Sequence, residues 1–96
     1  LLRALQIFRM NEPTLSELKS RSQKLKPVIH VGHEGITDAL VTALDQALSD
    51  HGLVKVRFTD HKSERKQLAA DLCVRTSSRQ ILLVGHTVAL YRSPTD

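Results

Sequence analysis

The chain has 96 residues, of which 41% are hydrophobic and 25% charged, with a net charge of +4 and a pI near 9.6. This length and composition indicate one soluble domain, and the basic excess favours a polyanionic partner. The single cysteine, Cys73, excludes an intrachain disulfide, and no apolar run approaches the roughly 20 residues that a membrane span requires.

The first nine residues differ from the rest of the chain. Their apolar run is interrupted by Arg3 and Arg9, and Met10 is followed by polar residues that resemble a natural start. We therefore predict that residues 1–9 are a non-native or disordered leader and that residues 10–96 form the domain.

The next forty residues predict two helices and a strand. Thr14-Leu15-Ser16-Glu17 is a capping box, which predicts a helix that ends near Lys24, before Pro27. Residues 28–31 are apolar enough to predict a buried strand. The three- and four-residue spacing of apolar side chains predicts a second helix over roughly residues 38–51, with Gly52 after its last turn.

The remaining residues predict three strands and a helix. Residues 53–58 alternate, with Val54, Val56 and Phe58 on one face and Lys55 and Arg57 on the other. A helix over about 63–76 follows, and strands at 81–84 and 88–92 form a hairpin. The order α-β-α-β-α-β-β predicts an α/β fold, a single compact domain with a four-stranded mixed sheet, because a strand-helix-strand unit is parallel and a hairpin antiparallel.

Charge is unevenly distributed along the chain. Residues 19–26 hold four basic residues and no acid, whereas residues 34–50 hold four acids and no Lys or Arg. Taken singly, each cluster is more often an ordinary solvated face than a binding site. Several basic clusters beside a glycine-rich loop favour a binding site for an anion.

That loop is Gly32-His33-Glu34-Gly35, between the first predicted strand and the second predicted helix. Glycines permit positive φ and a close approach of another molecule, and unpaired amides at the start of a helix suit a phosphate. The pattern by itself is more often structural. It is neither the dinucleotide fingerprint nor a P-loop, because no Gly-Lys-Ser/Thr follows.

An ordered set of short motifs resembles the CRM domain in its stand-alone, bacterial YhbY-like form. The motifs are Lys26-Pro27-Val28, Val31-Gly32-His33-Glu34-Gly35-Ile36-Thr37, residues 53–57, and residues 84–92, which end in Leu-Tyr-Arg. The resemblance implies an RNA-binding domain similar in fold to the C-terminal domain of translation initiation factor three. It also implies that the glycine loop acts as in KH domains and that ribosomal RNA in precursors of the large subunit is the partner.

The predicted RNA-binding residues comprise the loop and the basic side chains around it: Gly32, His33, Glu34, Gly35, Lys24, Lys26, Lys19, Arg21, Lys55, Arg57 and Arg92. Glu34 would repel a phosphate unless its side chain points away. The five histidines lack the spacings of known zinc sites, and Cys73 is expected to pack in the core. We predict no catalytic residue, metal or cofactor.

Two functions follow from these features. The first is a non-catalytic, monomeric and cytoplasmic RNA-binding protein that binds ribosomal RNA during assembly of the large subunit, with no membrane or small-molecule partner. The alternative is a small protein-interaction domain that uses the acidic face of the second helix to bind a basic partner such as a ribosomal protein.

Overall fold

The computed structural model describes residues 12–93, so the prediction for residues 1–9 lies outside the described part of the chain. The elements are α2 (Leu15–Lys24), β1 (Ile29–Val31), α3 (Asp38–His51), β2 (Leu53–Phe58), the 3₁₀ turn η1 (Lys62–Glu64), α4 (Arg65–Thr76), β3 (Arg79–Val84) and β4 (Thr87–Tyr91). Within residues 12–93, no helix has both the length and the apolar composition needed to cross a bilayer.

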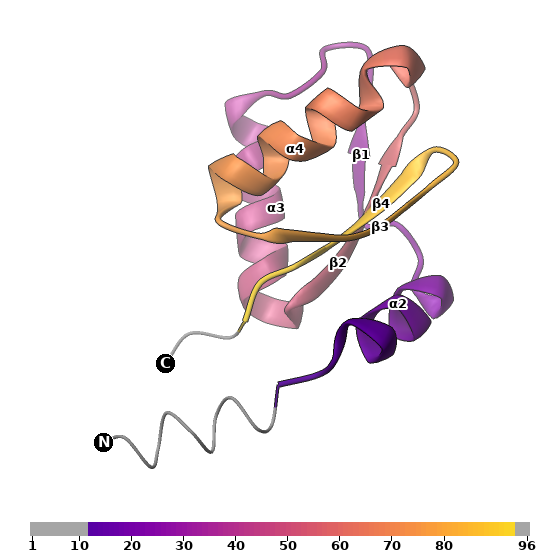
Figure 1. The fold of residues 1–96 in the computed structure, drawn as a ribbon. Coiled ribbons are helices and arrows are strands. Elements are labelled where there is room, and N and C mark those ends of the chain that lie inside the picture. Colours follow the sequence, from indigo (N-terminus) through magenta and orange to yellow (C-terminus); the bar gives the residue numbers. More distant parts are fainter. Residues whose placement is uncertain (1–11, 94–96) are drawn as a thin grey trace.

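The four strands form one mixed sheet in the order β1-β2-β4-β3. β1 runs parallel to β2, while β4 is antiparallel to both β2 and β3. The predicted element order and mixed sheet are therefore confirmed. Helices lie on both faces of the sheet, with α3 and α4 on one side and α2 on the other (Figure 1).

Alternation along the strands divides the interior into two clusters. Val54, Val56 and Phe58 of β2 pack with Leu44 of α3 and Leu72 of α4 in the main core. On the opposite face of the sheet, a smaller cluster gathers around α2: Leu18, Leu53, Ile81, Ala89 and Tyr91. Because both faces are covered, residues 88–91 of β4 are all buried.

Local hydrogen bonds explain why the helices begin and end where the sequence predicts. The Thr14 and Thr37 side chains accept hydrogen bonds from the main-chain N–H groups of Glu17 and Leu40, at 3.2 and 3.1 Å. Gly52 closes α3 with φ of +76°, a conformation that favours glycine. These caps confirm the predicted bounds of α3 and the start of α2.

Some bounds differ from the prediction. The first strand begins at Ile29 and is not buried throughout, because β1 lies at the edge of the sheet; the side chain of Val28 is 58% exposed. The third helix begins with the 3₁₀ turn η1. β3 starts two residues earlier than predicted, because polar Arg79 and Gln80 pair with β4 although they lack an apolar pattern.

Candidate nucleic-acid interface

Five basic side chains form what we call the cationic strip: Arg21, Lys24, Lys26, Lys55 and Arg57. Arg21 and Lys24 belong to the last turn of α2, and Lys26 lies in the connection to β1. Lys55 and Arg57 point to the α2 side of the sheet because their neighbours in β2 face the main core. The N–H of Val28 donates to the carbonyl oxygen of Lys55 at 3.1 Å, which fixes the connection beside β2.

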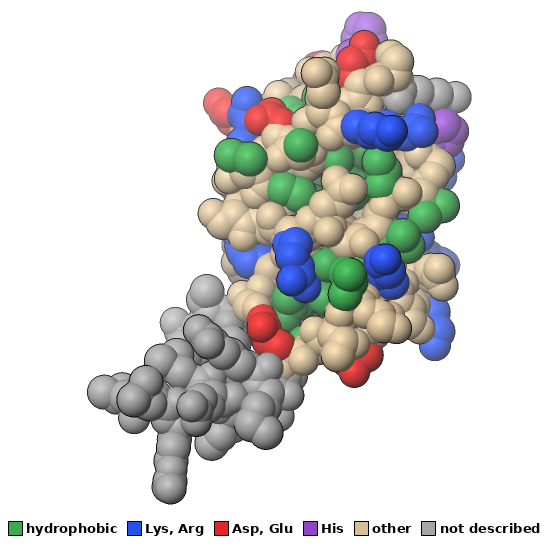
Figure 2. Space-filling model, viewed as in Figure 1, with side chains coloured by type: hydrophobic (Ala, Val, Ile, Leu, Met, Phe, Trp, Pro, Cys, Tyr) green, Lys and Arg blue, Asp and Glu red, His purple; other side chains and the backbone are tan. Residues whose placement is uncertain are grey.

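The cationic strip has no neutralising partner. In the part of the chain that the structure describes, none of its five side chains takes part in an ion pair. The α4 face turned toward the viewer carries basic side chains, with acidic side chains toward its edges (Figure 2). Cationic side chains that lack ion-pair partners and lie along one surface produce a positive potential, which attracts a polyanion.

The glycine loop follows β1, and the Arg57 end of the cationic strip lies beside the strand that leads into it, since His30 is the register partner of Arg57. The Gly35 N–H donates to the Gly32 carbonyl oxygen at 3.0 Å, and φ of Gly35 is +72°. The expectation of positive φ holds for Gly35 but not for Gly32. Within residues 12–93, the N–H groups of His33 and Glu34 have no protein hydrogen-bond partner, so they are available to a ligand.

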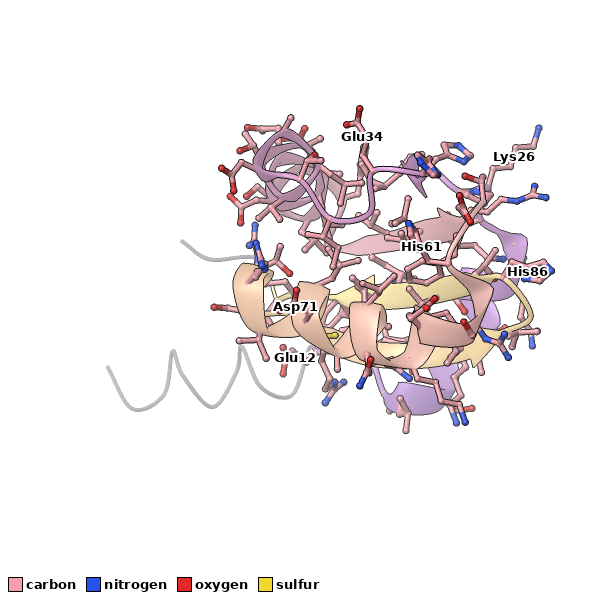
Figure 3. All side chains as sticks on the ribbon, turned by 90° about the horizontal axis from the view of Figure 1, so that it is seen from above. Glu12, Lys26, Glu34, His61, Asp71 and His86 are labelled. Atoms are coloured by element: carbon pink, nitrogen blue, oxygen red, sulfur yellow. The ribbon has the colours of Figure 1, made fainter. Side chains whose placement is uncertain are left out.

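Two acids, Glu34 and Asp60, belong to the loop region, and they are placed differently. The Glu34 side chain points away from the body of the domain (Figure 3). Asp60 accepts a hydrogen bond from the ring Nδ1 of His33 at 3.1 Å and one from the His61 N–H at 2.7 Å. The His61 N–H bond, and then the His33 bond, hold the pKa of Asp60 below its ordinary value of 3.8. Asp60 is therefore charged at neutral pH, and its carboxylate is hydrogen-bonded to His33 of the glycine loop and to His61.

The connection after β2 holds the glycine loop in place. The His61 ring donates through Nε2–H to the His33 carbonyl oxygen at 2.8 Å, and the two rings stack with centroids 6.4 Å apart. Thr59 donates from both its N–H and its hydroxyl to the Val31 carbonyl oxygen. His61 adopts φ of +59°, a strained conformation for a residue with a side chain. The strand ends of β1 and β2 thus position the free amides.

Sequence reasoning missed Thr59, Asp60 and His61. They lie 27 or 28 residues from their partners, so no local pattern connects them to the loop. The signal that could have found them was the parallel pairing of the first two strands, which places the residues after each strand side by side.

The structure does not bring two predicted residues to the interface. Arg92 is directed inward, where its guanidinium donates four hydrogen bonds to Asp45, Ser49 and the Thr76 carbonyl oxygen. Its side chain is only 19% exposed, so we assign it a structural role. Lys19 is exposed on α2, but it lies on a different side of the helix from Arg21 and Lys24. Leu18 and Ser22 form the buried side of this helix.

Other candidate chemistries gain no support. In residues 12–93, no group of three or more His, Cys, Asp or Glu is arranged to hold a metal ion. Cys73 packs against the main core, and burial raises the pKa of its thiol, which disfavours the reactive thiolate. On the acidic face of α3, Asp45 is occupied by Arg92, and Asp50 accepts a hydrogen bond from Gln46.

Comparison with known proteins decides the family. The model of the CRS1 / YhbY (CRM) domain matches residues 10–92. The chain belongs to the CRM domain family. It is 36% identical to an "RNA-binding protein" of Haemophilus influenzae, with 78% of this chain and 77% of that protein covered. It is 30% identical to "Probable RNA-binding protein YqeI" of Bacillus subtilis, with 82% and 83% covered.

A solved structure shares the α/β fold of the chain. The solution structure of the hypothetical protein SAV1595 from Staphylococcus aureus superposes with a TM-score of 0.74. The match covers 85% of this CRM domain and 86% of that protein at 24% sequence identity. At that identity, the likeness is evidence for the fold alone.

Proposed function

We propose that this CRM domain is a non-catalytic RNA-binding protein that acts as a monomer in the cytoplasm. Its RNA is ribosomal RNA in precursors of the large subunit. The observation that carries RNA binding is the juxtaposition of the cationic strip with the free amides of His33 and Glu34. Relatives in two bacteria with RNA-binding names support it, and the ribosomal partner rests on the resemblance to bacterial CRM proteins.

The mechanism is contact with the sugar–phosphate strand. Phosphate contacts come from main-chain N–H groups and from Lys and Arg, and they fix the position of RNA without reading its sequence. The two loop amides supply the first kind of donor. The cationic strip, from Arg57 on the sheet to Arg21 on α2, supplies the second. A negatively charged strand lying along these groups displaces its counterions, which makes the affinity dependent on salt.

The alternative function, binding of a basic protein by the acidic face of α3, is weaker on this structure. Asp45 forms an ion pair with Arg92, and Asp50 accepts a hydrogen bond from Gln46. Asp38 and the cations of the strip take part in no ion pair among residues 12–93. A partner for the α3 face would have to compete with the guanidinium of Arg92.

Crosslinking in the organism's own cells tests the proposal. With ultraviolet light and sequencing of the attached RNA, we expect reads to concentrate in precursors of the large-subunit ribosomal RNA. A variant with Lys26→Glu and Lys55→Glu is the control and should lose these reads. Reads spread evenly over all cellular RNA would contradict the ribosomal assignment. Recovery of the domain attached to another protein, with no attached RNA, would favour the alternative.

A further inference from the structure

A cavity of about 510 Å³ lies where the C-terminal end of α2 meets the start of β2. Its size falls within the roughly 300–1,000 Å³ typical of sites for small ligands. The phosphate contacts proposed above leave this space unfilled. The lining combines an apolar floor with a basic rim: Leu25, Val28 and Leu53 form the floor, and Arg21, Lys24, Lys26, Lys55 and His51 form the rim. Val54 also borders the cavity, but its side chain packs in the main core.

The floor presents aliphatic surface to solvent. The side chain of Val28 is 58% exposed and that of Leu25 is 38% exposed, and both belong to the short connection between α2 and β1. Below them, Leu53 is buried on the α2 side of the sheet and forms the base of the cavity. A ligand that covers this surface removes apolar area from water, which favours binding.

The rim selects the charge of that ligand. Four of the rim side chains belong to the cationic strip, no carboxylate lines the cavity, and none of these cations has an ion-pair partner in residues 12–93. The ligand must therefore offer an apolar body to the floor and negative groups on both sides of it. The cationic strip extends beyond the cavity to Arg57. We therefore expect the negative groups of the ligand to be part of a polyanion that is longer than the cavity.

We propose that the cavity holds one unpaired nucleotide of the bound RNA. The base lies on Leu25 and Val28, and its flanking phosphates contact Lys24, Lys26 and Lys55. The plane of the Arg21 guanidinium supplies a stacking surface for the base. A base within a duplex stays stacked between its neighbours and cannot enter, so the cavity makes the domain prefer RNA with an unpaired nucleotide. This inference rests on the proposed function and names the form of RNA that is bound.

The test compares two RNA hairpins that differ only in one unpaired, bulged nucleotide. The variant Leu25→Ser with Val28→Ser removes the apolar floor and keeps every cation. The matched control is Leu15→Ser with Val74→Ser, which changes one exposed Leu and one exposed Val outside the cavity. Thermal unfolding verifies that each variant is folded. If the floor variant is unfolded, Val28→Thr replaces it, since Thr keeps the shape of Val and adds a hydroxyl.

We expect the floor variant to bind the bulged hairpin roughly tenfold more weakly than the wild type, because burial of the base against the apolar floor is lost. Its affinity for the fully paired hairpin should stay within about twofold, as should the control's affinity for both RNAs. Equal binding of the bulged hairpin by the floor variant and the wild type would overturn the nucleotide site and leave the proposed function intact.

Two other results separate the remaining explanations. If the wild type binds neither hairpin, the proposed function itself fails. The third probe is a labelled peptide of alternating Glu and Leu, which offers the same combination of charge and apolar surface. If the wild type binds this peptide more tightly than the bulged hairpin and the floor variant does not, the cavity is a peptide site and the nucleotide assignment is overturned.

Discussion

Replacing Lys26 and Lys55 together by glutamate is expected to weaken binding of single-stranded RNA by about 100-fold, or about 1.4 kcal/mol for each lysine, since each substitution replaces a phosphate contact by a like charge. Both residues belong to the cationic strip, and the main-chain hydrogen bond from Val28 to Lys55 keeps their segments adjacent. The dependence of affinity on salt should change as well. For four to five neutralised phosphates the wild-type log–log slope is roughly −3, and losing two contacts should bring it to roughly −1.5.

The matched control for this variant is Lys66→Glu with Arg75→Glu, on the exposed side of α4. Both double variants have the same net charge, so a difference between them reports the location of the charges. We expect the α4 variant to keep RNA affinity within about threefold of the wild type at 0.15 M salt, where charges more than about 8 Å from the RNA are screened. Equal losses in the two variants would mean that net charge alone, without a defined strip, drives binding.

Arg92→Ala is expected to lower the free energy of unfolding by about 2–3 kcal/mol, because hydrogen bonds to a charged, largely buried group are lost. Arg92 follows the last residue of β4, and its guanidinium joins that strand to two helices. It donates to Asp45 and Ser49 of α3 and to the carbonyl oxygen of Thr76, the last residue of α4. Its removal leaves that carbonyl without this donor. In a domain of this size the melting temperature should fall by roughly 10–15 °C.

Arg75→Ala is the control for stability. Arg75 pairs with Asp71 one turn earlier in α4, and both side chains are 45% exposed, so the substitution should cost less than about 0.5 kcal/mol. At a temperature where both variants are folded, Arg92→Ala should bind RNA within about twofold of the wild type. If Arg92→Ala had a melting temperature near that of Arg75→Ala but bound RNA much more weakly, Arg92 would contact RNA and the structural role would be wrong.

Features set by neighbouring residues were predictable from the sequence, and those set by distant contacts were not. The caps at Thr14, Thr37 and Gly52 depend on residues three or four positions away, so α2 and α3 were predicted closely. The exposure of Val28 depends on the edge position of β1, which the apolar run does not report. The sequence order of strands likewise does not say which strand lies at an edge.

The same distinction applies to the interface. The alternation in β2 correctly predicted that Lys55 and Arg57 share a face, and the glycine spacing identified the loop. Whether a basic side chain points out or in depends on the elements packed around it. For that reason Arg92, a good phosphate contact by its position at the end of a strand, was not recognisable as a bridge between two helices.

The most direct test of the interface is the change in amide chemical shifts of the ¹⁵N-labelled protein on addition of single-stranded RNA. The two free amides of the glycine loop, His33 and Glu34, should shift most strongly, together with the amides of Lys26 and Lys55. The amides of α4 should remain in place. Shifts confined to the acidic face of α3, with the loop amides unchanged, would contradict the proposal that exposed main-chain donors and the cationic strip together hold the RNA.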